Sequence, residues 1–232
     1  MNNNTKNTLD EKLAVTKWYF HQHPMAFRLA TEARHCIRQY AAGKTLDLGA
    51  GMLTWRKALI THGHGVQYTS LDLEKRHSGL DIVADVCSGT DLPDGEFDTI
   101  FCSQVLEHVP HPHVFLTEAY RLCRPGGHLI LSTPFLFYLH GKPYDYFRYT
   151  PDGLATLARE AGFEIVECRG AGGLIAFLLM LPFTALLQVL GGLPLPLLLP
   201  LMITTPIWAF LDKMIDTSAR FPASVILVAN KK

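Results

Sequence analysis

The chain has 232 residues, enough for one large domain with a buried core and too few for two independent domains of ordinary size. Its 21 Lys and Arg residues balance 21 Asp and Glu residues, so it lacks the basic excess expected of a protein that binds nucleic-acid phosphates. The five cysteines, odd in number and without a CxxC pair, favour reduced thiols in a cytosolic compartment over a disulfide framework. The polar, Asn-rich N-terminus has no signal-peptide core, so we expect a cytoplasmic protein with no nucleic-acid partner.

Residues 1–43 predict a polar tail followed by helices. Residues 1–8 are typical of a disordered tail, and residues 9–40 favour helix. A break is expected at His23-Pro24, because the residue before a proline avoids the α region, and the following helix is expected to end before Gly43.

Short apolar strands alternate with helices from residue 44 onward. The expected strands are 44–48, 66–71, 81–84, 97–102, 128–132, 163–167 and 224–229, and the expected helices are 55–62, 114–122 and 151–161. This alternation predicts an α/β fold, namely a Rossmann-like, seven-stranded, mostly parallel sheet flanked by helices. Ligands of such sheets bind beyond the carboxyl ends of the strands, so those positions are the candidate site.

Three candidate ligand-binding features follow the first three expected strands in order. Gly49-Ala50-Gly51 follows the first strand, where glycine permits a tight turn and close approach of a ligand to the backbone. Asp72 ends the second strand and could accept hydrogen bonds from two ribose hydroxyls. Asp85 ends the third strand and could border an adenine with Val86, or could simply cap a turn. Nicotinamide-dependent oxidoreductases share the first two features, so these residues alone leave both classes open.

Longer segments resemble the class I S-adenosylmethionine-dependent methyltransferases, in particular the subgroup that methylates small molecules. Leu46-Asp-Leu-Gly-Ala-Gly51 resembles the first motif of that family and Ser70-Leu-Asp72 resembles the acidic second motif. Segments 97–109 and 122–131 resemble its fourth strand and the turn and strand that follow, which disfavours an oxidoreductase. One departure is Leu53, which stands where the family often has a third glycine that eases helix packing.

The resemblance implies S-adenosylmethionine as the cofactor and a role for each matching residue. The methionine part would be held by Asp47, Gly49, Ala50 and Gly51, the ribose by Asp72, and the adenine by Asp85 and Val86. Cys102, Ser103 and Gln104 would lie near the methyl donor.

Two further groups of residues are candidates for the acceptor side of the site. His108 follows the fourth strand and is the candidate general base, because a sugar hydroxyl stays protonated at neutral pH; the alternative is a structural histidine. The candidate substrate residues Tyr144, Asp145, Tyr146 and Arg148 follow the fifth strand, in a stretch that resembles the acceptor loop of methyltransferases of surface-polysaccharide or glycan synthesis; the alternative is a packed aromatic loop. The paired histidines along the chain lack acidic or cysteine partners, so we expect no metal site.

Residues 174–211 contain no charged side chain. Residues 174–192 as a helix would be about 28 Å long, close to the hydrocarbon thickness of a bilayer. Prolines interrupt the remainder and favour a re-entrant hairpin over two full spans. We expect membrane contact through this segment at the inner face; a buried lid or a dimer surface is the alternative.

The chain thus divides into an N-terminal region, 1–43, a methyltransferase domain, 44–173 with 221–232, and a hydrophobic helical insertion, 174–220. The expected function is methyl transfer to a small or lipid-linked acceptor, such as a glycan intermediate. The alternatives are a quinone or lipid methyltransferase and a non-catalytic cofactor-binding protein of the same fold.

Overall fold

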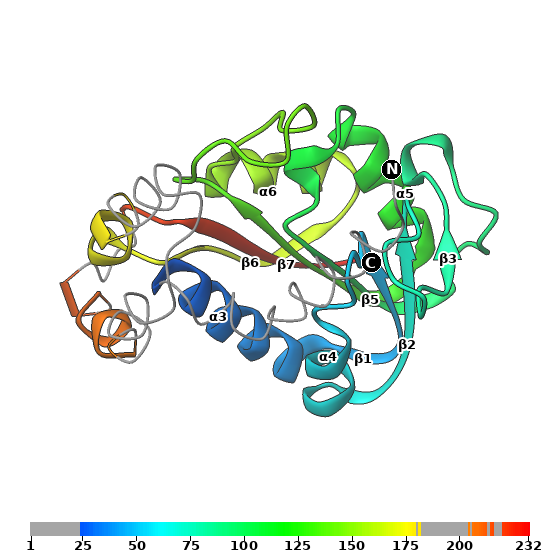
Figure 1. Cartoon of the computed structure of the whole chain (residues 1–232). Helices are drawn as coiled ribbons and strands as arrows, with labels where there is room; N and C mark the ends of the chain where they lie inside the picture. The colour runs from blue at the N-terminus through cyan, green and yellow to red at the C-terminus, as the bar shows by residue number, and fades with distance from the viewer. Residues whose placement is uncertain (1–23, 180, 182–203, 205, 213, 216–219) are drawn as a thin grey trace.

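The computed structural model describes residues 24–179, 181, 204, 206–212, 214–215 and 220–232. Seven strands form one sheet in the order β3-β2-β1-β4-β5-β7-β6, and β7 runs antiparallel to both of its neighbours (Figure 1). The strands are β1 Ala42–Leu48, β2 His64–Asp72, β3 Ile82–Val83, β4 Phe97–Ser103, β5 Cys123–Pro134, β6 Glu164–Ala171 and β7 Ser224–Asn230. The helices are α3 Pro24–Tyr40, α4 Arg56–His62, α5 Pro112–Leu122 and α6 Pro151–Glu160, with short 3-10 turns η1 Val86–Ser88 and η2 Leu106–His108.

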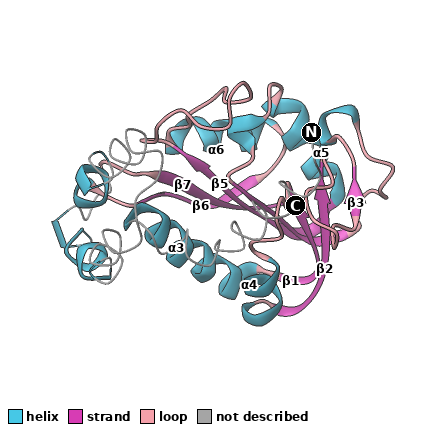
Figure 2. Cartoon of the chain, viewed as in Figure 1, coloured by secondary structure: helices cyan, strands magenta, loops and turns pink. Residues whose placement is uncertain are grey.

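Helices cover both faces of the sheet. Helices α3 and α4 lie on one face and α5 and α6 on the other (Figure 2). Ile37 of α3 and Leu59 of α4 are fully buried in one apolar cluster, while Leu116 of α5 and Leu154 of α6 are fully buried in the second. Each such buried side chain stabilises the fold by roughly 1.5–3 kcal/mol, so the two clusters fix the helices on the sheet.

The strand order reverses between β1 and β4, which lie side by side in the middle of the sheet. A crevice opens beyond the carboxyl ends of parallel strands at such a point, because the connections leave in opposite directions. The loops that follow β1 and β4 therefore meet there and define the candidate site.

The predicted fold is confirmed, and its main local difference concerns β5. Phe97 of β4 pairs with Cys123 and Thr99 pairs with His128, so the pairing skips residues 124–127. That stretch was predicted as a turn before the strand, and it forms a bulge inside β5, with Gly126 at φ +77°. The glycines of this stretch do let the chain turn away from β4, but only the pairing of Cys123 with Phe97 extends the strand back to Cys123.

Strands β6 and β7 bring the two ends of the apolar segment together. The Ala223 N–H donates to the Ala171 carbonyl at 3.0 Å, and Ser224 pairs with Pro134, where β5 ends. The segment therefore leaves and rejoins the sheet at the edge where the candidate site lies.

Residues 174–179 and 206–212 are helical. No helix among the described residues is long and apolar enough to cross a membrane. Residues 180, 182–203 and 205, on which most of the membrane prediction falls, lie outside the described part, as do residues 1–23. The division into three regions stays a prediction.

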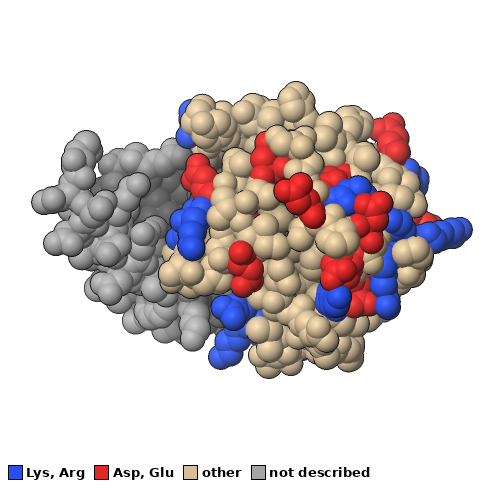
Figure 3. All heavy atoms as spheres, turned by 90° about the vertical axis from the view of Figure 1, so that its right-hand side faces the viewer, with Lys and Arg blue, Asp and Glu red and all other residues tan. Residues whose placement is uncertain are grey.

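The face shown in Figure 3 carries charged side chains of both signs, intermixed over its surface. Such mixing produces no broad field of one sign that would attract a polyanion. This distribution agrees with the balanced charge of the sequence.

Candidate active site

The glycine loop after β1 is bonded to the end of β2. The N–H groups of Gly49 and Ala50 donate to the Leu71 carbonyl at 2.8 and 3.0 Å, and the Gly51 N–H donates to Asp72 Oδ2 at 2.8 Å. Both glycines have positive φ, +77° and +53°. A Cβ on Gly49 would lie 2.4 Å from Val105 Cγ2, whereas a Cβ on Gly51 would meet nothing within 4 Å. Gly49 thus permits close approach of the loop after β4, and Gly51 borders open space.

Asp72 faces the glycine loop, as its predicted role requires. Its side chain is buried, Oδ2 accepts from Gly51 and Oδ1 accepts from the Glu74 N–H at 3.2 Å. A carboxylate oxygen has two lone pairs, so each retains one acceptor position. These positions fit the two ribose hydroxyls of an adenosyl cofactor.

Leu53 adopts a left-handed conformation, φ +57°, in the turn that precedes α4. The resemblance placed here a family glycine that eases helix packing, but the backbone conformation itself favours glycine at this position. A non-glycine residue in this region costs roughly 1–2 kcal/mol. Packing of Leu53 with Ala50 and Leu80 offsets part of that cost.

Asp47 lies in β1, just before the glycine loop, with 2% of its surface exposed. Its Oδ2 accepts a hydrogen bond from the Tyr68 hydroxyl at 2.8 Å. Burial raises the pKa of Asp47 to about 7, and the Tyr68 hydrogen bond partly opposes that rise. Asp47 is therefore positioned beneath the loop, where a bound cation would favour its ionised form.

Asp85 caps the 3-10 turn after β3. Its Oδ1 accepts from the Cys87 N–H at 2.9 Å, and its Oδ2 accepts from the Ser88 hydroxyl at 2.7 Å. Val86 is buried in the core cluster beside it. The turn-cap role is thus present, and the adenine role of both residues stays a prediction.

The residues after β4 link that strand to the end of β5. The Ser103 and Ser132 hydroxyls are 2.9 Å apart, and the Gln104 N–H donates to the Ser132 carbonyl at 2.8 Å. Gln104 has φ +58°, a strained conformation for a residue with a side chain, and such strain gathers at functional sites. Cys102 is fully buried beneath them.

The structure brings Glu107, His108 and His140 together, with the ligand atoms of all three within 4.8 Å of one another. Glu107 is completely buried, and its Oε1 lies 3.7 Å from Nε2 of each histidine. The Glu107 carboxylate raises the pKa of His140. His108 was a candidate from the sequence, but its contacts with Glu107 and His140 were not predicted. His140 lies on a different loop, 32 residues along the chain, and nothing in its spacing indicates that it approaches His108.

The predicted substrate residues divide into two kinds. Asp145 and Arg148 form a two-point ion pair at 2.5 and 2.8 Å, and this pair holds the pKa of Asp145 well below its usual range. Arg148 also donates to the Tyr138 carbonyl, so the pair braces the loop after β5. Tyr144 and Tyr146 are 63% and 45% exposed and are the members that an acceptor can reach.

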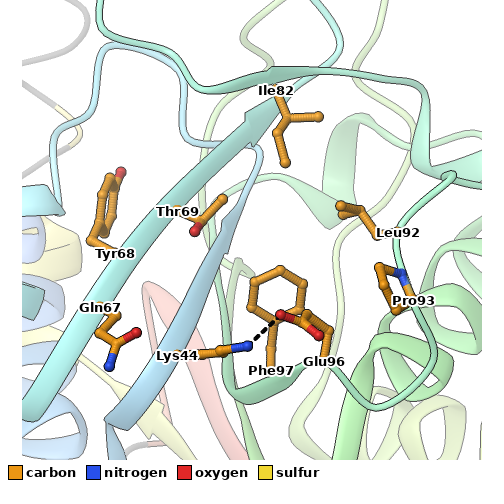
Figure 4. Close-up of a pocket in the computed structure, with 9 residues that line it drawn as sticks. All are labelled: Lys44, Gln67, Tyr68, Thr69, Ile82, Leu92, Pro93, Glu96 and Phe97. Carbon is orange, nitrogen blue, oxygen red and sulfur yellow. Dashed lines mark hydrogen bonds and ion pairs between the residues drawn. The ribbon is translucent and has the colours of Figure 1, made fainter.

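A hollow of about 420 Å³ lies elsewhere, beside Lys44 of β1 and the middle of β2 (Figure 4). Lys44 and Glu96 line it and form an ion pair at 2.6 Å. Gly49 and Asp72 do not line it, so it belongs to a different part of the sheet. It is lined by Lys44, Gln67, Tyr68, Thr69, Ile82, Leu92, Pro93, Glu96 and Phe97.

Residues 22–168 match a family model described as "Methyltransferase domain". Similar curated proteins include ubiquinone biosynthesis O-methyltransferases of Cupriavidus pinatubonensis, 29% identical over 164 residues, and of Thiobacillus denitrificans, 31% identical over 160 residues. The matches cover 58% and 56% of this chain and 65% and 68% of those relatives, so the similarity spans about two thirds of their length.

Similar solved structures include a SAM-dependent methyltransferase from Archaeoglobus fulgidus, with TM-score 0.58, 14% identity, and coverage of 88% of this chain and 93% of that one. Another is the [4+2]-cyclase SpnF, with TM-score 0.60, 18% identity, and coverage of 89% and 81%. At these identities the likeness shows the fold alone, which serves more than one reaction.

The predictions of family, fold and cofactor are confirmed by these matches. Since the family model covers more than half of its residues, this chain belongs to the class I S-adenosylmethionine-dependent methyltransferases.

Proposed function

We propose that this chain transfers a methyl group from S-adenosylmethionine to a hydroxyl of a small or lipid-linked acceptor, such as a glycan intermediate. The contact that supports this most directly is the 2.8 Å hydrogen bond from the Gly51 N–H to Asp72 Oδ2. It fixes an open glycine loop beside a carboxylate that keeps free acceptor positions, the arrangement that an adenosyl group needs.

Each residue near the loop has a proposed role in holding the cofactor. Asp47, Gly49, Ala50 and Gly51 bind the methionine part, Asp72 binds the ribose, Asp85 and Val86 border the adenine, and Cys102, Ser103 and Gln104 lie near the methyl group. The bound cofactor supplies a methyl group that its sulfonium charge already activates. The protein therefore mainly needs to align the acceptor and exclude water.

On the acceptor side, His108 is the proposed general base. Its Nδ1 lies 2.5 Å from the Tyr144 carbonyl, which can only accept, so Nδ1 carries the proton and Nε2 is free to take another. Tyr144 and Tyr146 contact the acceptor, while Asp145 and Arg148 hold the loop in place.

The lipid-linked part of the proposal rests on the exposed apolar side chains near this edge. Phe137, in the loop after β5, packs against the cluster of Ala176 and Ala223 at the start of the apolar segment. Large apolar side chains are exposed on the loop after β5, on the apolar segment and on the residues that follow it: Leu139, Tyr144, Tyr146, Phe147, Leu178, Leu181, Ile207, Phe210, Met214, Ile215 and Phe221. An apolar surface of this kind suits contact with the inner face of a membrane through 174–211.

A quinone precursor is the second candidate acceptor. The curated relatives at 29% and 31% identity are named ubiquinone biosynthesis O-methyltransferases. The same exposed apolar side chains would suit the tail of such a substrate.

Calorimetric titration with S-adenosylhomocysteine tests the cofactor site. We expect micromolar binding and at least tenfold weaker binding by Asp72→Ala, because the ribose hydroxyls lose their acceptor. The control Asp91→Ala, at an exposed position, should bind as the wild type does. If the folded protein does not bind S-adenosylhomocysteine but binds NADH tightly, the proposal is contradicted.

Incubation with labelled S-adenosylmethionine and extracts of the source organism tests the acceptor. We expect label in the membrane fraction, extractable into organic solvent. Mild acid should release the label into water if a lipid-linked glycan carries it, whereas a methylated quinone precursor would keep it in the organic phase. Label only in soluble molecules would exclude a lipid-linked acceptor, and absence of label despite cofactor binding would favour a non-catalytic protein.

A further inference from the structure

The buried Glu107 carboxylate accepts no hydrogen bond from the described residues. Both of its oxygens are inaccessible to solvent and lack a partner, and the 3.7 Å distances to His108 and His140 exceed hydrogen-bond length. A buried carboxylate without a proton, an ion or donors is strongly unfavourable. The position therefore calls for a proton on Glu107 or for a cation between Glu107 and the two histidines.

The outer nitrogen of each imidazole is engaged by the backbone. His108 Nδ1 faces the Tyr144 carbonyl at 2.5 Å, and His140 Nδ1 faces the Tyr138 carbonyl at 3.2 Å. A carbonyl oxygen only accepts, so both Nδ1 atoms carry the proton in the neutral rings.

Two other groups face His140 Nδ1, and neither changes its protonation. Asp145 Oδ2, at 3.8 Å, is also an acceptor. Arg148 Nη2 lies 3.4 Å away, but its two hydrogens are used at 2.8 and 2.9 Å by Asp145 and the Tyr138 carbonyl. In the neutral rings, the two Nε2 lone pairs therefore converge on the Glu107 carboxylate.

We propose that Glu107, His108 and His140 form a divalent transition-metal site at the acceptor side of the pocket. Two imidazoles and one carboxylate, each imidazole oriented by a second hydrogen bond to a carbonyl, form the kind of ligand set that binds Zn²⁺, Mn²⁺ or Fe²⁺ rather than Mg²⁺ or Ca²⁺. Bonds of about 2.1 Å would place tetrahedral ligands about 3.4 Å apart. Glu107 Oε1 lies 3.7 Å from each Nε2, and the ligand atoms of all three residues lie within 4.8 Å of one another, so binding an ion would draw the side chains closer together.

The cluster is also open on one side. The histidine side chains are 29% and 27% exposed while Glu107 is fully covered, so an ion there keeps coordination positions toward solvent. The two loops can approach because Gly141 lies against the His108 ring, where a Cβ would come within 2.8 Å of Cε1. The site thus joins the loop after β4 to the loop after β5.

This inference rests on the proposed function and refines it. A cation beside a bound acceptor hydroxyl lowers the pKa of that hydroxyl, and its proton leaves to bulk water. His108 then acts as a ligand instead of a general base. Direct metal binding distinguishes the two roles.

The test uses untagged, full-length protein that has been treated with a chelator and dialysed. Calorimetric titration with Zn²⁺ should show one ion bound per chain. Titration with Co²⁺ should give a visible absorption spectrum typical of Co²⁺ bound by nitrogen ligands. Glu107→Gln and His140→Gln should each weaken binding at least tenfold. His113→Gln, a histidine that is 67% exposed on α5, is the matched control and should bind as the wild type does.

Thermal unfolding separates a loss of metal binding from a change in the stability of the variant. Glu107→Gln removes the unpaired buried charge, so the metal-free variant should unfold at or above the unfolding temperature of the metal-free wild type. Zn²⁺ should raise the unfolding temperature of the wild type and leave that of the variant unchanged. Wild type without a stoichiometric ion, or Glu107→Gln that binds equally well, would overturn the metal site. S-adenosylhomocysteine titrated into the same metal-free protein reports the proposed function separately, because its contacts lie at Gly51 and Asp72.

Discussion

The two acidic residues beside the glycine loop differ in their hydrogen-bond donors. Among the described residues, Asp72 receives two backbone N–H donors, whereas Asp47 receives the Tyr68 hydroxyl alone and is nearly excluded from water. Burial therefore raises the pKa of Asp47 to about 7, and the folded protein binds this proton more tightly than the unfolded chain. The contribution of Asp47 to stability is complete below about pH 4 and is lost as pH rises to 7.

Asp47→Asn should therefore stabilise the protein at alkaline pH. The amide keeps an acceptor for Tyr68 but cannot ionise, so we expect a gain of roughly 3–5 kcal/mol at pH 9 that shrinks toward pH 5, as the pKa difference requires. Urea unfolding of the variant and the wild type at both pH values measures it. The exposed substitution Asp91→Asn serves as the control. An equal difference at pH 5 and pH 9 would show that Asp47 does not titrate between them.

At the same scale, the sequence predicted where the candidate residues lie relative to the strands better than which contacts they make. Asp72 was identified from its place at the end of a strand, and it lies against Gly51 as expected. Asp85 and Arg148 were identified equally well by position, yet their polar atoms bond within their own loops. Sequence position locates a side chain, but its rotamer and partners depend on atoms far along the chain.

At the scale of elements, helix α5 holds the loop before β4. Glu118 accepts two hydrogen bonds from Arg121, at 2.8 and 2.7 Å, and two from Thr90, at 2.9 and 2.6 Å. Arg121 also donates to the Leu92 carbonyl. The Arg121 guanidinium lowers the pKa of Glu118 to about 2, so this contribution to stability is complete above about pH 4.5 and is lost as pH falls toward 2.

Glu118→Gln should destabilise the protein by roughly 1–3 kcal/mol at pH 7, because a nearly buried charged hydrogen bond is lost. The difference from the wild type should narrow by pH 3.5, because the unfolded wild-type chain takes up a proton there that the folded Glu118 carboxylate does not, and urea midpoints at the two pH values measure it. Glu96, which pairs with Lys44, has a side chain that is 34% exposed, compared with 10% for Glu118. Glu96→Gln should therefore cost less than about 1 kcal/mol. If Glu118→Gln lowers the free energy of unfolding no more than Glu96→Gln does, the hydrogen bonds of Glu118 do not hold the loop before β4.

The elements themselves were largely predictable, and their ends were not. Helix α6 was predicted to begin at residue 151, and in the structure Thr150 caps it: the Thr150 hydroxyl accepts from the Gly153 N–H at 3.1 Å, with Pro151 in the first turn. Such caps are local chemistry and can be identified in the sequence. The start of β5 at Cys123 depends on a pairing with Phe97 that no local pattern contains.

At the scale of the whole molecule, one edge of the sheet gathers the loops after β1, β2, β4 and β5, together with the start of the apolar segment. Val105 packs on Gly49, the Gln104 N–H donates to the Ser132 carbonyl, and Phe137 packs on the cluster of Ala176 and Ala223. The glycine loop, the loop after β5 and the start of the apolar segment therefore lie along one edge. In the proposed function, a lipid-linked acceptor would reach the cofactor from this edge.

The sequence by itself determined the α/β class, the order of the strands along the chain and the glycine turn after the first strand, because these depend on periodicity and on turn chemistry within a few residues. The cofactor was implied by the resemblance of longer segments to a family, and the family match confirms it. Only the tertiary structure decided the convergence of Glu107 with His140 and the inward pairing of Asp145 with Arg148. It also decided the left-handed turn at Leu53. These features arise from contacts between segments that packing brings together, and such contacts leave no regular spacing in the chain.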